Sequence, residues 1–268
     1  MNKRWMVLGA MACVGLTSGG AVAESETGSA IIRLSTGVEY ASGAYGGDND
    51  ISEVYVPISV GISSARIGAR LTVPHLSVDG PFAAPNVDGS VVDTGSVTQS
   101  GLGDIVASVT FYDVMQNPKH GLAVDLTCKV KFGTADASQG LGTGENDYSV
   151  LTDVYKFFDP IALVGTVGYK IRGEPAGISL DDVLLGSVGG LCTCSERSRI
   201  GLFYDYRGAS LTNSDAVQEL AIYGSRVLNS AWQLQYYAFR GFTDSGPDWG
   251  GGVQVGVNLP RYRLRDRD

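Results

Sequence analysis

Residues 122–133 read LAVDLTCKVKFG and alternate in polarity along almost their whole length. One face of this segment carries Leu122, Val124, Leu126, Cys128, Val130 and Phe132, and the other carries Asp125, Thr127, Lys129 and Lys131. An alternation of period two is typical of a β-strand with one apolar and one polar face. The segment alone leaves open whether the apolar face contacts a protein core or lipid, and that choice decides the class of protein.

Segments of this kind recur along the chain, separated by turn-rich stretches. No segment shows convincing helical periodicity, so the pattern predicts an all-β chain. The twelve predicted strands span residues 31–45, 51–63, 65–76, 103–114, 121–133, 149–158, 161–172, 183–194, 199–209, 216–228, 231–243 and 250–260.

The connections between the predicted strands alternate in length. The odd-numbered connections are the longer ones, including residues 77–102 and residues 135–148, whereas the even-numbered ones are as short as Ser64 or Asn229-Ser230. Outer-membrane barrels have an even number of strands of about ten residues, long extracellular loops and short periplasmic turns. The sequence therefore predicts a closed antiparallel transmembrane β-barrel of about 12 strands, with the apolar rows facing lipid.

Aromatic residues in the apolar rows gather near the strand ends, as the two interfacial girdles of a barrel should. A soluble β-sandwich could also alternate in polarity, but it would explain neither the girdles nor the loop asymmetry. The predicted girdle at the long-loop end contains Tyr40, Phe132, Tyr169 and Tyr206, and the one at the turn end contains Phe111, Phe158 and Trp232.

The N-terminus has the layout of a secretory signal peptide. Lys3 and Arg4 precede a short apolar run, and small residues follow up to Ala23. We therefore expect a signal peptide at residues 1–23, a mature barrel at residues 24–268, and export to the outer membrane of a Gram-negative bacterium. The apolar run is too short to span a bilayer, and no other stretch approaches the roughly 20 apolar residues of a spanning helix.

Charge and cysteine content exclude several other functions. Loss of Lys3 and Arg4 with the leader reduces 20 basic residues to 18 against 28 acidic ones, a net charge of −10, which disfavours nucleic-acid binding. The mature chain keeps Cys128, Cys192 and Cys194, an odd number without a Cys-x-x-Cys pair. We expect these cysteines to pack as small apolar residues.

Three segments resemble one outer-membrane family. They are GLGDIVASVTFYDV from residue 101, KFGTADASQGLGTGENDYSV from residue 131, and GFTDSGPDWGGGVQVGV from residue 241. Together they span residues 101–257 and are similar to the outer-membrane β-barrel family named for the meta-pathway of phenol degradation. The resemblance implies a channel-forming or transporter-like barrel, and members are suspected of moving aromatic or other small organic molecules. It carries over no agreed binding residues.

The C-terminus departs from the expected pattern of such barrels. They should end on an aromatic residue that the insertion machinery recognises, whereas this chain continues into PRYRLRDRD. Two arrangements stay open: Tyr262 replaces the terminal aromatic residue, or a short charged tail at about residues 261–268 hangs into the periplasm.

If the apolar rows face lipid, ionisable residues of the alternate rows are candidates for lining the lumen. One interpretation is a water-filled pore whose opposite charges orient polar solutes, and the other is a set of structural ion pairs that partly fills the barrel. The binding candidates are Arg33, Glu39, Glu53, Arg66, Arg70, Asp125, Lys129, Lys131, Asp153, Lys170, Arg172, Asp205 and Arg207, with Asp104 and Arg199 beside them.

These features predict an outer-membrane channel or facilitator for the passive passage of small solutes, including aromatic or other small organic molecules. Its expected partners are outer-membrane lipid, the barrel-insertion machinery and a small-molecule solute, and the oligomeric state is left open. We expect no cofactor. The alternative is a closed structural or ligand-binding surface barrel.

Catalytic and metal sites are weaker hypotheses. A surface hydrolase would need a histidine with a nucleophile, and His75 with Ser77 is the one such pair, without a Gly-x-Ser-x-Gly motif. The other histidine, His120, lies in a predicted turn. The acidic loops lack the regular oxygen-ligand spacing of a calcium site. We therefore expect neither enzyme activity nor a bound metal.

Overall fold

The computed structural model describes residues 29–85, 91–177, 179–211, 214–259 and 262–263. Within these ranges nearly all regular structure is β-strand, apart from the short 3-10 helices η2 (Pro118–His120) and η3 (Ala137–Gln139). No helix in the described ranges is long and apolar enough to cross a membrane. The predicted signal peptide and residues 261 and 264–268 of the predicted tail lie outside the described residues.

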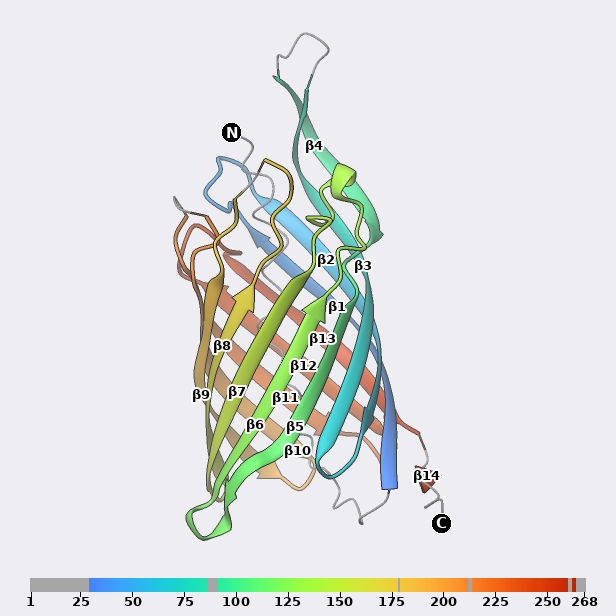
Figure 1. Cartoon of the computed structure of the whole chain (residues 1–268), viewed down its shortest axis with the longest axis vertical. Helices are drawn as coiled ribbons and strands as arrows, with labels where there is room; N and C mark the ends of the chain where they lie inside the picture. The colour runs from blue at the N-terminus through green and yellow to red at the C-terminus, as the bar shows by residue number, and fades with distance from the viewer. Residues whose placement is uncertain (1–28, 86–90, 178, 212–213, 260–261, 264–268) are drawn as a thin grey trace.

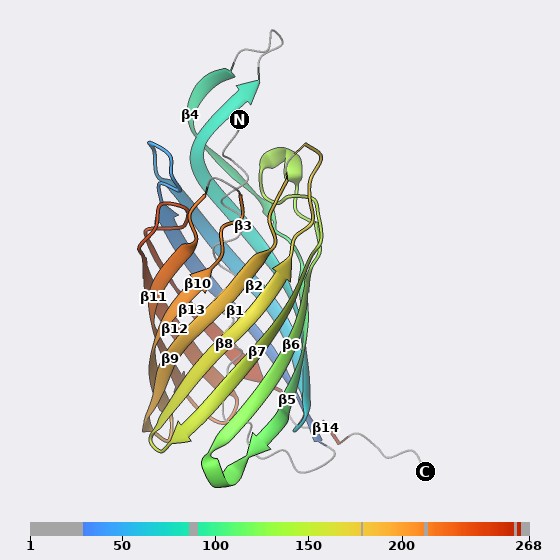
Figure 2. The same cartoon turned by 60° about the vertical axis from the view of Figure 1, so that its left-hand side comes forward.

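Twelve of the described strands form the wall of a closed antiparallel barrel (Figures 1 and 2). β1 pairs with β2 on one side and with β13 on the other, which closes the sheet. This confirms the predicted fold class. The wall strands are β1 (Ser29–Gly43), β2 (Ile51–Ser63), β3 (Ile67–Pro85), β5 (Val106–Asn117), β6 (Leu122–Lys131), β7 (Asp147–Phe158), β8 (Ile161–Ile171), β9 (Val183–Ser195), β10 (Ser198–Arg207), β11 (Val217–Val227), β12 (Trp232–Gly241) and β13 (Trp249–Asn258).

One predicted loop is instead a hairpin. β3 pairs with β5 from Ile67 to Thr72, but from His75 to Pro85 it pairs with β4 (Val91–Leu102). Both views show this hairpin extending beyond the long-loop end of the barrel. The long loop predicted over residues 77–102 is therefore a paired β-hairpin in its described parts. The β-branched residues of β4 favour a strand, but its two glycines and its aspartate resemble a turn-rich sequence.

The turn end shows two local features. In β5 the pairing with β6 shifts register between Phe111 and Met115, where the backbone of Asp113 has a φ of 51°. The short strand β14 (Tyr262–Arg263) pairs with the start of β1 at Ser29 and Ala30. The described part of the predicted tail therefore continues the sheet beside β1.

The outer surface of the barrel is apolar. Every wall strand contributes large exposed apolar side chains, among them Ile58 at 65%, Val167 at 56% and Leu202 at 54% exposure. Such a continuous apolar surface is far larger than soluble monomers tolerate. The predicted girdle residues point outward and are exposed, except that Tyr206 is half-buried.

The barrel interior contains small apolar clusters in place of a continuous core. One cluster joins Ala41, Ala221 and Phe239, and another joins Val164, Phe203 and Tyr223. A third packs Leu141 of the β6–β7 loop against Leu76 and Ala135, which holds this loop at the rim. The rest of the interior mixes polar and charged side chains with single apolar ones such as Val106, Leu151 and Leu185.

Candidate functional site: the barrel lumen

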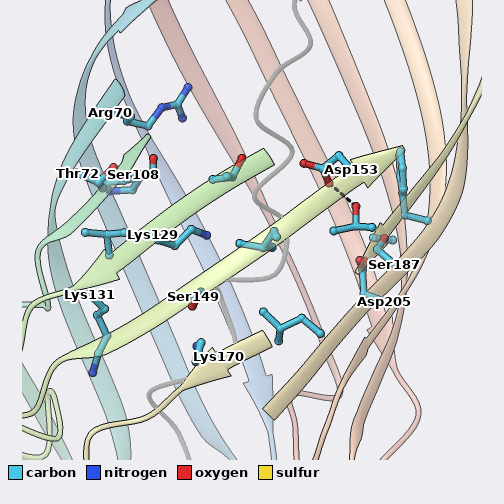
Figure 3. A pocket seen from close by; sticks show the side chains of 18 of the residues that line it. Arg70, Thr72, Ser108, Lys129, Lys131, Ser149, Asp153, Lys170, Ser187 and Asp205 are labelled. Carbon is cyan, nitrogen blue, oxygen red and sulfur yellow. Dashed lines mark hydrogen bonds between the residues drawn. The ribbon is translucent and has the colours of Figure 1, made fainter. Parts of the chain in front are cut away.

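A cavity of about 290 Å³ lies in the lumen, and all twelve wall strands contribute residues to its lining. Figure 3 shows part of this lining. Thr143 of the β6–β7 loop also lines the cavity, so this loop reaches the lumen. Pockets that bind small molecules commonly have volumes of about 300–1,000 Å³. The cavity is therefore of a size for one small organic molecule with water.

Most of the charged residues predicted for the lumen line this cavity. Arg33 instead lines a much smaller void of about 10 Å³ nearer the turn end, together with Arg70. Lining a cavity does not establish a binding role, so the binding role of these charged residues stays a prediction. The predicted residues that line the main cavity are Glu39, Arg70, Lys129, Lys131, Asp153, Lys170, Arg172 and Asp205.

Arg66 and Asp125 do not line the cavity and instead support the register shift in β5. Arg66 lies in the exposed turn before β3, where its Nη1 donates to the carbonyl oxygen of Asp113 at 3.3 Å. The amide of Asp113 donates to Oδ1 of Asp125 at 2.8 Å. The cavity lining does not include Arg66, which lies in an exposed turn where polarity alternation no longer reports the direction of a side chain.

Glu53 and Arg207 belong to a buried polar cluster at the long-loop end. The hydroxyl of Tyr45 donates to Oε1 of Glu53 at 3.3 Å, and Arg207 attracts the carboxylates of both Glu53 and Glu219. Burial, followed by the charge of Glu53, raises the pKa of Tyr45, so this hydroxyl remains a donor at neutral pH. Glu53, Arg207 and Glu219 are each at most 6% exposed. Nη1 of Arg207 and Oε1 of Glu219 are buried without a hydrogen-bond partner, so the cluster brings opposite charges near one another without a direct ion pair among these three residues.

Lys131 lines the cavity but is tied to the rim. Its Nζ lies 2.8 Å from Oδ2 of Asp104 and 3.5 Å from Oδ2 of Asp147, and it donates to Oγ1 of Thr143 at 3.3 Å. Oδ1 of Asp104 accepts from the amide of Ala135 at 3.0 Å. Lys131 therefore fastens the β6–β7 loop across the ends of its strands.

Acidic and hydroxyl side chains form a continuous row across six neighbouring strands. Residues that pair directly across a sheet point to the same face. Oγ1 of Thr166 donates to Oδ1 of Asp153 at 2.6 Å (Figure 3), so the row has internal hydrogen bonding. This acidic row consists, in pairing order, of Asp125, Asp153, Thr166, Ser187, Asp205 and Glu219.

An uncharged wall that the sequence did not reveal lies on β7 to β12. Val164, Phe203 and Tyr223 are at most 8% exposed, and Tyr155 and Tyr237 pack against them. We call these five residues the aromatic wall, and all of them line the cavity. The sequence of β10 does contain a signal for this wall, because Phe203, Asp205 and Arg207 are two residues apart and therefore share one face. The expectation that aromatic residues face lipid hides this signal.

The histidines lie away from the cavity. His75 is exposed and lies four residues after outward-facing Leu71 in β3, so it is on the same outer face. His120 is exposed in η2, and neither histidine lines the cavity. Among the described residues, no group of three or more His, Cys, Asp or Glu side chains could hold a metal ion. Cys128 and Cys194 are exposed, Cys192 is half-buried, and all three are free thiols.

Comparison with solved structures shows where this fold occurs. The chain is similar to an outer-membrane channel from Pseudomonas putida F1, with a TM-score of 0.64 and 11% identity over 87% of this chain and 96% of that one. It is also similar to the KdgM porin, with a TM-score of 0.51 and 9% identity over 85% and 99% of the two chains. No family model and no curated protein matches the sequence. The protein thus has the closed β-barrel fold found in outer-membrane channels.

Proposed function

We propose that this protein is an outer-membrane channel for the passive passage of small solutes. The observation that carries the proposal is a cavity inside a closed barrel, lined by charged side chains from strands whose outer faces are apolar. The apolar exterior matches the apolar lipid tails. The closed sheet also leaves no unpaired strand edge in the bilayer. Ionisable residues of a membrane barrel are tolerated where they face water or one another.

We further infer membership of the outer-membrane barrel family named for the meta-pathway of phenol degradation. The three similar sequence segments support this inference. On this proposal residues 1–23 are a cleaved signal peptide, residues 24–268 are the mature chain, and the barrel-insertion machinery and outer-membrane lipid are its partners. We propose no catalytic role, since both histidines lie outside the cavity.

Passage would be driven by the solute gradient alone. The lumen charges would replace part of the hydration of a polar solute, and the cavity volume would limit passage to small molecules. The β6–β7 loop narrows the path from the outside, because Thr143 lines the cavity and Lys131 holds the loop in place. No cofactor is needed for such a mechanism.

A closed barrel that binds a ligand is the second candidate. The observation that favours it is the buried cluster of Tyr45, Glu53, Arg207 and Glu219, which occupies the long-loop end. A binding barrel would retain a small molecule in the cavity and conduct no ions. A channel would conduct even when no specific ligand is bound.

Conductance in planar bilayers and solute flux into liposomes test the proposal. We expect discrete single-channel steps from the purified protein. Ser149 lines the cavity, so Ser149→Phe should lower conductance severalfold, whereas Val150→Phe, at the neighbouring outward-facing position, should not. Absence of steps and of flux from folded protein would refute the channel and favour the binding barrel.

A further inference from the structure

Basic side chains occupy one continuous row of the lumen, on alternate strands. Arg33 of β1 pairs with Gly61 of β2, which pairs with Arg70 of β3, and the same order continues through β5, β6, β7 and β8. Cations and small residues alternate at every step. This basic row consists of Arg33, Gly61, Arg70, Ser108, Lys129, Ser149 and Lys170.

The row rises along the barrel axis. Arg33 is near the beginning of β1 at the turn end, whereas Lys170 is the residue before the last of β8, at the long-loop end. Neighbouring strands are about 4.8 Å apart, so backbones of successive cations are separated by about 10 Å. A side chain that reaches inward from each position can pass a bound anion to the next. The cations therefore extend from the turn end, where Arg33 borders the small void, to the long-loop end, where Lys170 lines the main cavity.

The small residues of the row take up little of the lumen. Ser108 and Ser149 add hydroxyl groups that can donate to an anion, and neither fills the space between the longer side chains. Arg33 is held in place by the hydrogen bond from its Nε to Oδ1 of Asn258 at 2.7 Å. Figure 3 shows Arg70, Lys129 and Lys170 apart from Asp153 and Asp205. On β6 to β8 the basic row lies nearer the long-loop end than the acidic row, and the charge of Lys129 still acts on the carboxylate of Asp153.

The aromatic wall borders the same cavity as the basic row. Phe203 and Tyr223 line the cavity together with Arg70, Lys129 and Lys170. Backbone space is reserved for the ring of Phe203, because a Cβ at Gly189 would lie 2.4 Å from its Cδ1. An occupant of the cavity would meet cations and aromatic rings, and also the carboxylates of Asp153 and Asp205, which lie two residues from Tyr155 and Phe203. The combination of cations and rings suits an anion that carries an apolar body.

We propose that the channel is selective for small organic anions with an aromatic or apolar body, whose carboxylate moves along the basic row while the body contacts the aromatic wall. This inference rests on the proposed channel function and adds its solute class. Guanidinium and ammonium groups bind carboxylates through charge-assisted hydrogen bonds. Aromatic rings attract a planar apolar body through stacking and burial.

The first test uses the unaltered protein with three probes of nearly equal size: benzoate, neutral benzamide and benzylammonium. We expect liposome flux in that order, and a reversal potential in a salt gradient that indicates preference for anions. Equal fluxes, or faster passage of benzylammonium, would overturn the solute class while leaving the channel intact. Absence of any conductance would overturn the channel itself, and this inference with it.

The second test removes the row. The triple variant Arg70→Gln, Lys129→Gln, Lys170→Gln should lower the anion-to-cation permeability ratio about tenfold. Its matched control, Lys119→Gln, Lys156→Gln, Arg197→Gln, removes the same charge from positions near the turn end that do not line the cavity, and it should keep the ratio of the parent. The single variant Lys129→Gln should lower the anion-to-cation permeability ratio about two- to threefold. This variant keeps the test decisive if the triple variant does not fold. A conducting variant with an unchanged ratio would contradict the proposal.

Discussion

The two walls of the lumen differ in how they are packed. The aromatic wall is dense, with Phe203 at 4% exposure and a glycine opposite its ring. The basic row alternates long charged side chains with serine or glycine and borders open cavity. We infer that the aromatic wall contributes mainly to stability, and the basic row mainly to the choice of solute. Substitutions matched across the two walls can separate these roles.

The largest effect on stability is expected from Phe203→Ala. Removing a buried phenylalanine side chain costs about 3–5 kcal/mol in free energy of unfolding, because contacts are lost and a cavity remains. Leu202→Ala is the matched control, since this neighbour faces outward at 54% exposure, and it should cost less than about 1 kcal/mol. Urea unfolding in lipid vesicles measures both. Equal losses would mean that the aromatic wall is not close-packed.

A glycine of the same region should be nearly as sensitive. At Gly189 an added side chain would meet the carbonyl oxygen of Leu202 and the ring of Phe203, both at 2.4 Å. We expect Gly189→Ala to lower the free energy of unfolding by about 1–3 kcal/mol through overpacking. Gly165→Ala is the control, because a Cβ added there would meet no neighbouring heavy atom within 4 Å. A tolerated Gly189→Ala would show that the wall can relax.

Lys131 and Lys129 offer the same comparison within one strand. Lys131→Gln removes the contacts to Asp104 and Asp147 and should cost about 1–2 kcal/mol in free energy of unfolding, with greater protease cleavage of the β6–β7 loop. Lys129→Gln should cost less than Lys131→Gln and act mainly on the permeability ratio. If the two variants exchanged these effects, Lys131 would belong to the solute path and Lys129 to the rim.

The sequence sufficed for much of the fold because alternation, loop length and aromatic ends each report a different property of a membrane barrel. Prediction from sequence failed where one residue pattern fits two different local structures. The strand β4 contains turn-like glycines, and Arg66 stands in a turn where alternation ends. Phe203 has the chemistry of a lipid-facing residue, although it points inward. Phe203 lies two residues before Asp205 in β10, so the alternation that places Asp205 in the lumen also places Phe203 there.

The residues of the candidate site were predictable by charge, but their arrangement was not. Alternation places Lys129 and Lys170 in the lumen, whereas their membership of one row depends on the register between strands. Register arises from all the turns and the hairpin together, including the change of partner in β3. Burial of Glu53 and Arg207 likewise depends on contacts between distant segments. No local pattern in the sequence reports such contacts.

Thiol labelling along β6 tests the central claim most directly, that alternate faces of LAVDLTCKVKFG contact lipid and a water-filled lumen. In a background with Cys192→Ser and Cys194→Ser, the natural Cys128 is compared with a Cys128→Ser protein carrying Lys129→Cys. A small, charged, membrane-impermeant thiol reagent should modify Lys129→Cys and reduce conductance, while Cys128 reacts only with a lipid-soluble reagent. Modification of Cys128 by the charged reagent, with Lys129→Cys unreactive, would contradict the assignment of the two faces.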